Sequence, residues 1–340
     1  MLDLIPVRSG QSSTDALRAT VNLAQAAEQA GVHRYWVAEH HNMAAVASTN
    51  PPVLIALLAG ATSRMRIGSG GMMLPNHAPL VVAEQFALLE AAYPGRIDLG
   101  IGRAPGSDPV TSFALRHNGP ETADANRFDE VVDNVLAMLE PEGVGLQLQG
   151  RSYPLRATPQ AVGVPQVWLL GSSDYSARLA AAKGLPYVFA HHFSGEGTSQ
   201  IIDLYRSSFR PSDFLDRPQT FLTVNVVVAE TQEEADRLAR PQLLAMVALR
   251  TGGELRAQLS VEEAEATVLA ESHAALAEQM RTRWVIGTPE TALAQITALA
   301  ERYGVDEVML NPVAGSTASD PLDRAPTREA TLRLLAGALV

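Results

Sequence analysis

Residues 65–101 read MRIGSGGMMLPNHAPLVVAEQFALLEAAYPGRIDLGI and contain one complete unit of the predicted fold. Two short apolar runs, 65–70 and 97–101, have the composition of buried strands. A helical pattern over 80–92 lies between them and stops at Pro94 and Gly95, residues that end helices. A strand, a helix and a second strand in this order predict a parallel pair joined by a crossover helix.

The same alternation extends through the rest of the chain. Helical patterns such as 14–30, which Ser12, Ser13 or Thr14 can cap, and 124–139 separate the strand patterns. The predicted strands are eight, at 2–7, 34–38, 65–70, 97–101, 166–170, 186–190, 221–228 and 305–310. Eight strands alternating with helices favour one α/β domain over residues 1–340, a (β/α)8 TIM barrel.

Two long insertions interrupt this alternation, at about 141–165 and 245–285. Insertions in barrels usually decorate the rim at the C-terminal ends of the strands, where active sites lie. The second insertion is acidic and helical, and we interpret it as a candidate lid.

Composition excludes several functional classes. The 340 residues are 46% hydrophobic and 19% charged, as in soluble globular proteins. The chain has no cysteine, which excludes disulfides, thiolate zinc sites and cysteine nucleophiles. Its net charge of -11 argues against nucleic acid and anionic membranes as partners. Without a signal-peptide pattern or a membrane-spanning run, we expect a cytoplasmic protein.

Histidines follow two of the predicted strands at the end where barrel enzymes place catalytic groups. His40 and His41, in AEHHN, follow the second strand, and His191 and His192, in FAHHF, follow the sixth. Neighbouring residues on a strand point to opposite sides, so we predict no metal site at His40 and His41. For each histidine, a role in the core is at least as expected as acid–base chemistry.

Phosphate-binding side chains follow the fourth and fifth strands. Arg103 lies in GIGRAPG, whose glycine spacing is one residue too long for a dinucleotide fingerprint. Its guanidinium suits a phosphate, although a surface ion pair would explain it equally. Ser172 and Ser173 start a helix, where they either bind an anion or cap the helix. Because these strands are neighbours, we expect these three residues to close on one phosphate.

Four segments carry a family resemblance: WVAEHH at 36–41, Asn50-Pro51, IGSGGMMLPNHAP at 67–79 and AEQFALLEAAYPGRIDLGIGR at 83–103. In this order and spacing the chain resembles the bacterial luciferase-like flavin monooxygenases. The resemblance is strongest over 2–130 and 164–195, and within the family the chain resembles the single-chain members more than the light-emitting subunits. The resemblance implies reduced FMN as cofactor, oxygen as co-substrate and a C4a-hydroperoxyflavin that oxygenates a small organic substrate. It also implies a separate NAD(P)H:flavin reductase as the source of reduced FMN.

The resemblance assigns roles by position. His40 matches the catalytic histidine, with His41 beside it, and Gly70-Gly71 match a cis peptide bond against which the flavin ring lies. The residues assigned to the cofactor phosphate are Arg103, Arg127, Ser172, Ser173, Tyr175 and Ser176. The residues expected at the organic substrate are Asn50, Met72, Met73, His191 and Phe193. Gly171 and Gly102 replace an acidic residue and a reactive cysteine of the light-emitting subunits, so light emission is not implied.

Several alternatives remain open at this point. A deazaflavin-dependent hydride-transfer oxidoreductase of the same superfamily would suit the same glycine-rich strand end. A metal-dependent barrel hydrolase would use His40, His41 and His191, and a non-catalytic flavin-binding subunit would act through a partner. We also predict a homodimer, because the helices 80–92 and 124–139 carry more apolar residues than one face requires, Phe86, Leu88 and Leu89 among them.

Overall fold

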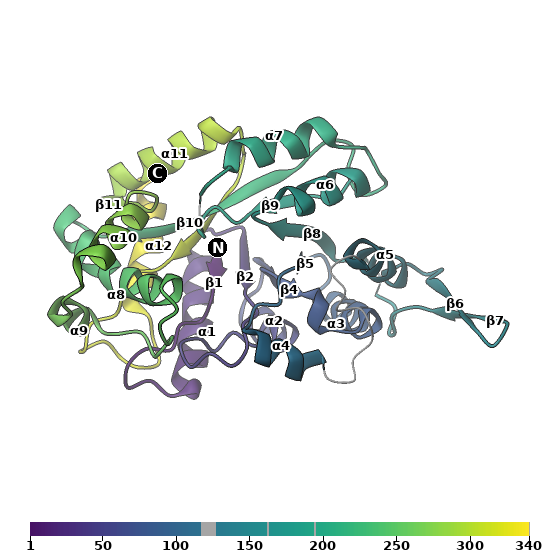
Figure 1. Ribbon diagram of the computed structural model, residues 1–340, viewed down its shortest axis with the longest axis horizontal. Helices are drawn as coiled ribbons and strands as arrows, with labels where there is room; N and C mark the ends of the chain where they lie inside the picture. Colours follow the sequence, from purple (N-terminus) through teal and green to yellow (C-terminus); the bar gives the residue numbers. More distant parts are fainter. Residues whose placement is uncertain (117–126, 162, 194, 340) are drawn as a thin grey trace.

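Eight parallel strands form a nearly closed barrel in the computed structural model, which describes residues 1–116, 127–161, 163–193 and 195–339 (Figure 1). In barrel order the strands are β1 (Leu2–Asp3), β2 (Arg34–Val37), β3 (Arg66–Ser69), β5 (Ile97–Gly102), β8 (Gln166–Gly171), β9 (Tyr187–Phe189), β10 (Thr220–Val228) and β12 (Val308–Pro312). β12 pairs with β10 and lies beside β1, which completes the ring. The predicted (β/α)8 barrel and its eight predicted strands are confirmed.

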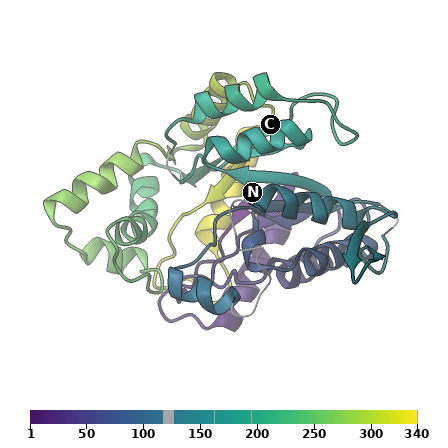
Figure 2. The same ribbon diagram turned by 45° about the vertical axis from the view of Figure 1, so that its right-hand side comes forward.

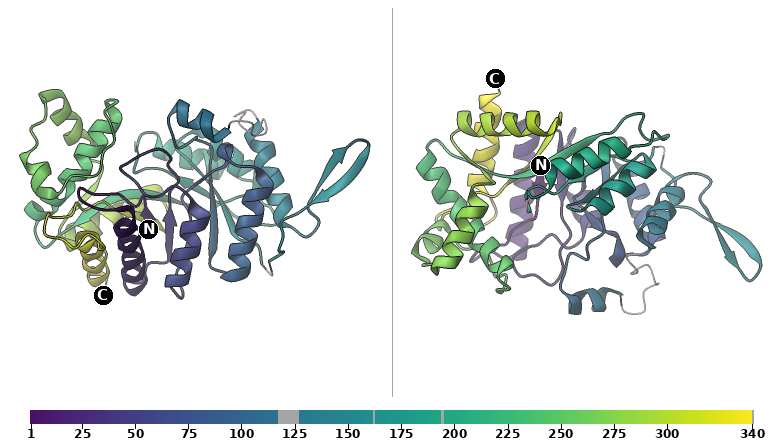
Figure 3. Two further views of the ribbon diagram at one scale, coloured as in Figure 1. Left: turned by 90° about the horizontal axis from the view of Figure 1, so that it is seen from below. Right: turned by 45° about the horizontal axis from the view of Figure 1, so that its top comes forward.

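Four further strands lie outside the prediction. β4 (Met72–Met73) pairs with β5, and β11 (Val285–Gly287) pairs with the last residues of β10. β6 (Val144–Leu148) and β7 (Arg151–Leu155) form an antiparallel hairpin inside the insertion 141–165. This hairpin follows α5 (Phe128–Leu139) and projects away from the barrel in both views of Figure 3.

Helices cover the outside of the barrel and return the chain from one strand to the next. They are α1 (Ser13–Gln29), α2 (Pro51–Ala61), α3 (Pro79–Ala92), α5, α6 (Asp174–Lys183), α7 (Thr198–Ser208), α11 (Pro289–Tyr303) and α12 (Pro326–Ala338). Ser12 caps α1 in a capping box with Asp15. The predicted helix 124–139 is α5, although residues 124–126 lie outside the described residues. Within the described ranges, no helix is long and apolar enough to cross a membrane.

The second insertion, together with the helix that leads into it, forms a separate group of helices. α8 (Gln232–Arg250) is followed by α9 (Val261–Ala266) and α10 (Glu271–Arg281), and the three gather on one side of the barrel (Figures 1 and 2). α4 (Pro109–Arg116) and the short 3-10 helix Leu74–Asn76 lie in the loops that follow β5 and β4.

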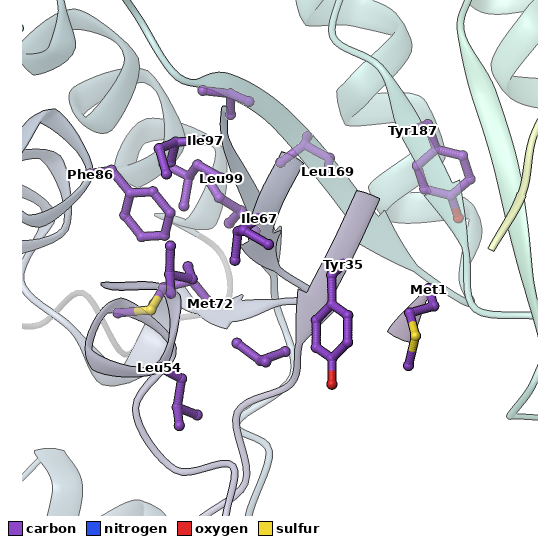
Figure 4. Packing of buried hydrophobic residues seen from close by; sticks show 14 of the residues in the cluster. Met1, Tyr35, Leu54, Ile67, Met72, Phe86, Ile97, Leu99, Leu169 and Tyr187 are labelled. Carbon is purple, nitrogen blue, oxygen red and sulfur yellow. The ribbon is translucent and has the colours of Figure 1, made fainter. Parts of the chain in front are cut away.

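The interior of the protein has two layers. Alternate strand residues such as Tyr35, Ile67 and Leu99 pack outward against the helices, as Figure 4 shows. Inside the barrel, Trp36 packs with Trp168, whose ring centroid lies 5.7 Å away, and with Phe221. These aromatic rings fill the barrel, so the space for a ligand lies at its C-terminal rim.

Candidate active site

The loop after β2 carries a buried carboxylate that holds three rim segments together. Glu39 accepts hydrogen bonds from His41 Nε2 and His77 Nε2, both at 2.8 Å, and from the Met73 amide at 2.7 Å. Burial acts to raise the pKa of Glu39, but the hydrogen bonds from His77, His41 and Met73 outweigh it and lower this pKa below its usual value. Asn76 extends the network by donating to the Pro105 carbonyl at 2.9 Å. The loops after β2, β4 and β5 are therefore fixed relative to one another.

His40 points away from this network. Its side chain lines a cavity, whereas His41 turns to Glu39, as the pleat of a strand requires. The Nδ1 atom of His40 is buried and has no hydrogen-bond partner among the described residues. Burial lowers the pKa of His40, and the charge of Glu39 only partly opposes this effect. A neutral imidazole with a free nitrogen is suited to exchange a proton with a ligand.

The peptide bond between Gly70 and Gly71 is cis. It lies between β3 and β4, where the chain moves from one strand to the next. A Cβ atom at Gly71 would come within 2.2 Å of the Leu170 side chain and 3.0 Å of the Gly100 carbonyl oxygen. Only glycine fits here, because the neighbouring backbone of β5 approaches so closely.

Arg103 and Tyr175 meet at the rim. The guanidinium carbon of Arg103 lies 4.2 Å from the centroid of the Tyr175 ring, and no carboxylate of the described residues pairs with it. Ser172 is exposed and Ser173 is the N-cap residue of α6, whose side chain caps no amide within the described structure. The serine hydroxyls and the helix N-terminus are therefore available to an anion beside Arg103.

Two of the residues assigned to the phosphate make other contacts in this structure. Arg127 forms an exposed ion pair with Glu130 at 2.9 Å, at the start of α5. Ser176 is buried under Gly171, with its hydroxyl oxygen 2.8 Å from where a Cβ of that glycine would lie.

Of the residues expected at the substrate, only Phe193 lines the cavity that His40 lines. Asn50 caps α2 by accepting from the Val53 amide, and Met72 is 1% exposed within the core between strands and helices (Figure 4). Met73 faces the rim instead, against Gly102 and Gly106. The pleat of β4, which the sequence pattern does not reveal, turns Met72 toward the helices and Met73 toward the rim.

The side chain of His191 points away from the cavity, whereas that of its neighbour His192 is directed into the protein. The Nδ1 atom of His191 lies 2.8 Å from the Thr198 hydroxyl, and its ring contacts Tyr303 on α11. His192 has a buried Nδ1 atom without a partner among the described residues. Burial, together with the charges of His191 and His40, lowers the pKa of His192 to about 4. The doubled histidine after the sixth strand was the only sequence signal for it.

Two asparagines that the sequence analysis did not select form a hydrogen-bonded chain with His192. Asn225 of β10 donates to the His192 carbonyl at 3.1 Å, and Asn311 of β12 donates to the Asn225 side chain at 2.8 Å. Asn311 is buried and lines the same cavity as His40. Such inward amides in the middle of apolar strands are a signal that sequence reading could have used.

The cavity has a volume of about 460 Å³, which is typical of small-molecule sites. It lies between the ends of β1 and β12, the loop after β2, and α8. Arg103, Ser172 and Tyr175 are not part of its lining, so these three residues and the cavity are two separate parts of one rim.

A metal centre is not assembled from the histidines. His40, His41 and His191 point in three different directions, toward the cavity, Glu39 and Thr198. Among the described residues, no three histidine, aspartate or glutamate side chains are grouped as metal ligands. The metal-dependent hydrolase alternative therefore loses the ligand set on which it rested.

Comparison with known proteins finds one matching family model and several similar proteins. A family model described as luciferase-like monooxygenase matches residues 1–307. A luciferase-like monooxygenase of Escherichia coli (strain K12) is 44% identical over 252 residues, covering 74% of this chain and 72% of that protein. The N-acetyl-S-alkylcysteine monooxygenase of Bacillus subtilis (strain 168) is 32% identical and covers 100% of this chain and 97% of that protein.

Solved structures agree with the fold. Apo-MsnO8 superposes with a TM-score of 0.86 at 32% identity, covering 100% of this chain and 97% of that one. Two distant structures share the barrel at low identity. The oxygenating constituent of 3,6-diketocamphane monooxygenase from Pseudomonas putida, in complex with FMN, has a TM-score of 0.71 at 18% identity over 99% and 96% of the two chains. An F420-dependent secondary alcohol dehydrogenase has a TM-score of 0.64 at 16% identity over 96% and 94%.

Proposed function

The chain belongs to the luciferase-like monooxygenase family, and from this membership we propose that it binds reduced FMN and uses oxygen to oxygenate a small organic substrate. The observation that carries the proposal is the pairing of an anion site with a cavity. Arg103, Ser172 and the N-terminus of α6 suit a phosphate, and His40 faces the cavity beside them.

The residues at the rim fit a phosphorylated flavin. Arg103 stacks on Tyr175 without a carboxylate of the described residues, so its charge is free for an anion. The unpartnered Nδ1 of His40 provides a polar contact at the boundary with the cavity. Reduced FMN would supply the electrons that activate oxygen, since no side chain of this protein carries redox chemistry of that kind.

The protein's own part is to bind, orient and manage protons. Arg103 and Ser172 would hold the phosphate, while Glu39 fixes the loops that carry Met73 and the cis peptide bond. His40 would accept or donate a proton at Nδ1, because burial keeps its imidazole neutral near pH 7. α8 covers the cavity with apolar side chains and would exclude water from the reaction.

A deazaflavin-dependent hydride transfer is the second candidate, because an F420-dependent structure shares this barrel. The two relatives described above, from Escherichia coli and Bacillus subtilis, are 44% and 32% identical and carry monooxygenase names, which favours oxygen chemistry. We further propose that a separate NAD(P)H:flavin reductase supplies reduced FMN. The purified chain should then leave NAD(P)H unoxidised in the presence of FMN, until such a reductase is added.

The phosphate assignment can be tested with Arg103→Ala. Because the guanidinium contacts only the phosphate in this proposal, the variant should bind FMN about 10- to 150-fold more weakly, the worth of one charge-assisted hydrogen bond. Riboflavin, which lacks the phosphate, should bind to the variant and the parent equally. Fluorescence titration with both ligands measures this. An equal loss for FMN and riboflavin would place Arg103 at the ring and refute the assignment.

A further inference from the structure

If the proposed function holds, the lining of the cavity beside His40 indicates which class of substrate the protein takes. Most of its lining is apolar, from Leu4 of the chain after β1 to Val313 after β12. α8 contributes Gln242, Ala245, Met246 and Leu249. These four residues follow the spacing of one helix face, so a single stripe of α8 forms one wall.

Each charged residue in the lining is already committed within the protein. Arg328 is buried, with Nη2 2.7 Å from Asp3 Oδ1 and Nε donating to the Pro312 carbonyl at 2.7 Å. Asp108 accepts from the amides of Val110 and Thr111 at the start of α4. Arg256 lies at the exposed edge of the lining, where its side chain is 80% exposed and its charge is paired with Glu254 at 2.8 Å.

The polar groups that remain are neutral. Gln258 donates to the Gln242 side chain at 2.7 Å, and Asn311 donates to Asn225. Arg250, just beyond the lining, donates to the Phe193 carbonyl and lies over its ring. Residues 117–126, which the structure does not describe, contain no lysine or arginine that could supply a cation.

We propose that this cavity selects an uncharged, mainly apolar substrate and rejects an anion of the same size. A carboxylate or sulfonate inside it would lose its hydration without gaining a cation, which costs several kcal/mol. A neutral molecule gains from the apolar walls and needs at most one hydrogen bond from the asparagine pair. With a thioether, for example, one oxygen atom of O2 forms the S–O bond. The other leaves as water, with two electrons and two protons from reduced FMN.

Two probes of matched size test the inference by calorimetric titration of the protein in the presence of oxidised FMN. Hexyl methyl sulfide is neutral, and 6-(methylthio)hexanoate carries a carboxylate on a chain that still fits the cavity. The Kd of the sulfide should be at least about 100-fold lower than that of the carboxylate, because the cost of burying an unpaired carboxylate is larger than the free energy that corresponds to a 100-fold change in Kd. Equal affinity, tighter binding of the carboxylate, or no binding of the sulfide overturns the proposal.

A charge placed on the α8 wall should reverse this selection. Met246→Lys puts a cation into the lining and should strengthen binding of the carboxylate by at least about 10-fold. Ala275→Lys on the exposed side of α10 makes the same change in net charge outside the cavity and should have no effect. If both variants bind the carboxylate alike, the cavity is not what selects against it.

A turnover assay distinguishes failure of the proposed monooxygenase function from failure of the proposed selectivity for an uncharged substrate. Oxygen-dependent formation of the sulfoxide with reduced FMN tests the proposed function, whereas the affinity ratio of the two probes tests only the cavity. Failure of oxygen chemistry with an intact preference for the sulfide would refute the monooxygenase alone. Oxygenation of the carboxylate probe in preference to the sulfide would refute the selectivity alone.

Discussion

His40 and His41 are adjacent in the chain, but the structure gives them different surroundings. His40 has a buried Nδ1 at the cavity without a partner among the described residues, while His41 donates from Nε2 to Glu39. His40→Ala should keep FMN binding, because the phosphate contacts lie elsewhere, but product formation should fall by about 10²- to 10⁴-fold. Oxygen should then be consumed to hydrogen peroxide. His41→Ala should cost less than about 10-fold, through the loop contacts of Glu39 alone.

A peroxide assay and a product assay on the same samples make this comparison. Full coupling in the His40 variant together with loss of coupling in the His41 variant would show that the reacting atoms lie on the side of Glu39. If neither variant is impaired, the acid–base role of this strand end is refuted.

His192 predicts how stability depends on pH. Its folded pKa is about 4, whereas an unfolded histidine has a pKa of about 6.5. Below pH 6.5 the unfolded chain therefore gains a proton that the folded chain does not accept until about pH 4. Stability should fall as the pH falls through this range, by about 2 kcal/mol between pH 7 and 5 from this residue alone.

Urea unfolding at pH 7 and pH 5 measures that loss. His192→Gln should show a smaller loss than the parent protein, and His33→Gln, at an exposed histidine, should behave as the parent does. An identical pH dependence in the His192 variant and the parent would mean that the imidazole is hydrated or partnered in solution.

The residues at the rim were partly predictable. Position after a strand was enough to select His40, Arg103 and Ser172, because the C-terminal ends of parallel strands share one rim. It was not enough to decide the direction of a side chain. Met72 packs against the helices because an unexpected strand imposes its pleat. Arg127 pairs with Glu130, three residues further along the chain in the first turn of α5.

At the level of elements, α9 and α10 depend on α8 for their position. Arg240 of α8 donates to the Ala264 carbonyl at 2.7 Å and to the Thr267 carbonyl at 2.8 Å, at the end of α9. Arg240→Ala removes both bonds, worth about 1.5–3 kcal/mol, so amide hydrogen exchange over 261–281 should accelerate about 10- to 100-fold. Arg178→Ala on α6, at an exposed ion pair, is the matched control. Unchanged exchange in both variants would contradict this anchoring role.

The same segment shows which elements a sequence can reveal. The eight barrel strands were predictable because buried parallel strands are continuous apolar runs. β4 follows β3 after only Gly70 and Gly71, and β11 begins at the last residue of the second insertion, so neither forms a separate apolar run between turn residues. The β6–β7 hairpin also escaped prediction, because Leu146, Leu148 and Tyr153 are exposed on an isolated ribbon that no core pattern requires. Whether 245–285 opens as a lid stays a prediction, which faster exchange at α9 would support.

On the scale of the whole molecule, only part of the exposed apolar surface lies where the sequence placed it, on α3. Phe86 and Leu89 are buried, and the apolar residues of α5 face the core. α2, in contrast, is apolar on every side, yet it exposes 66% of Val53 and 44% of Leu57. Leu88 on the neighbouring α3 is 56% exposed. A helix that is apolar all round needs a cover on its outer face.

A second copy of the chain would provide that cover, because a two-fold contact pairs one such face with its equal. We therefore expect a homodimer with twice the mass of 36.3 kDa at micromolar concentration, measured by light scattering after gel filtration. Leu57→Asp combined with Leu88→Asp should give monomers, since each places charges in a contact that must exclude water. Val268→Asp, at a position that is 94% exposed between α9 and α10, should leave the dimer intact. A monomeric parent protein, or dissociation by Val268→Asp alone, would show that α2 and α3 are not the contact.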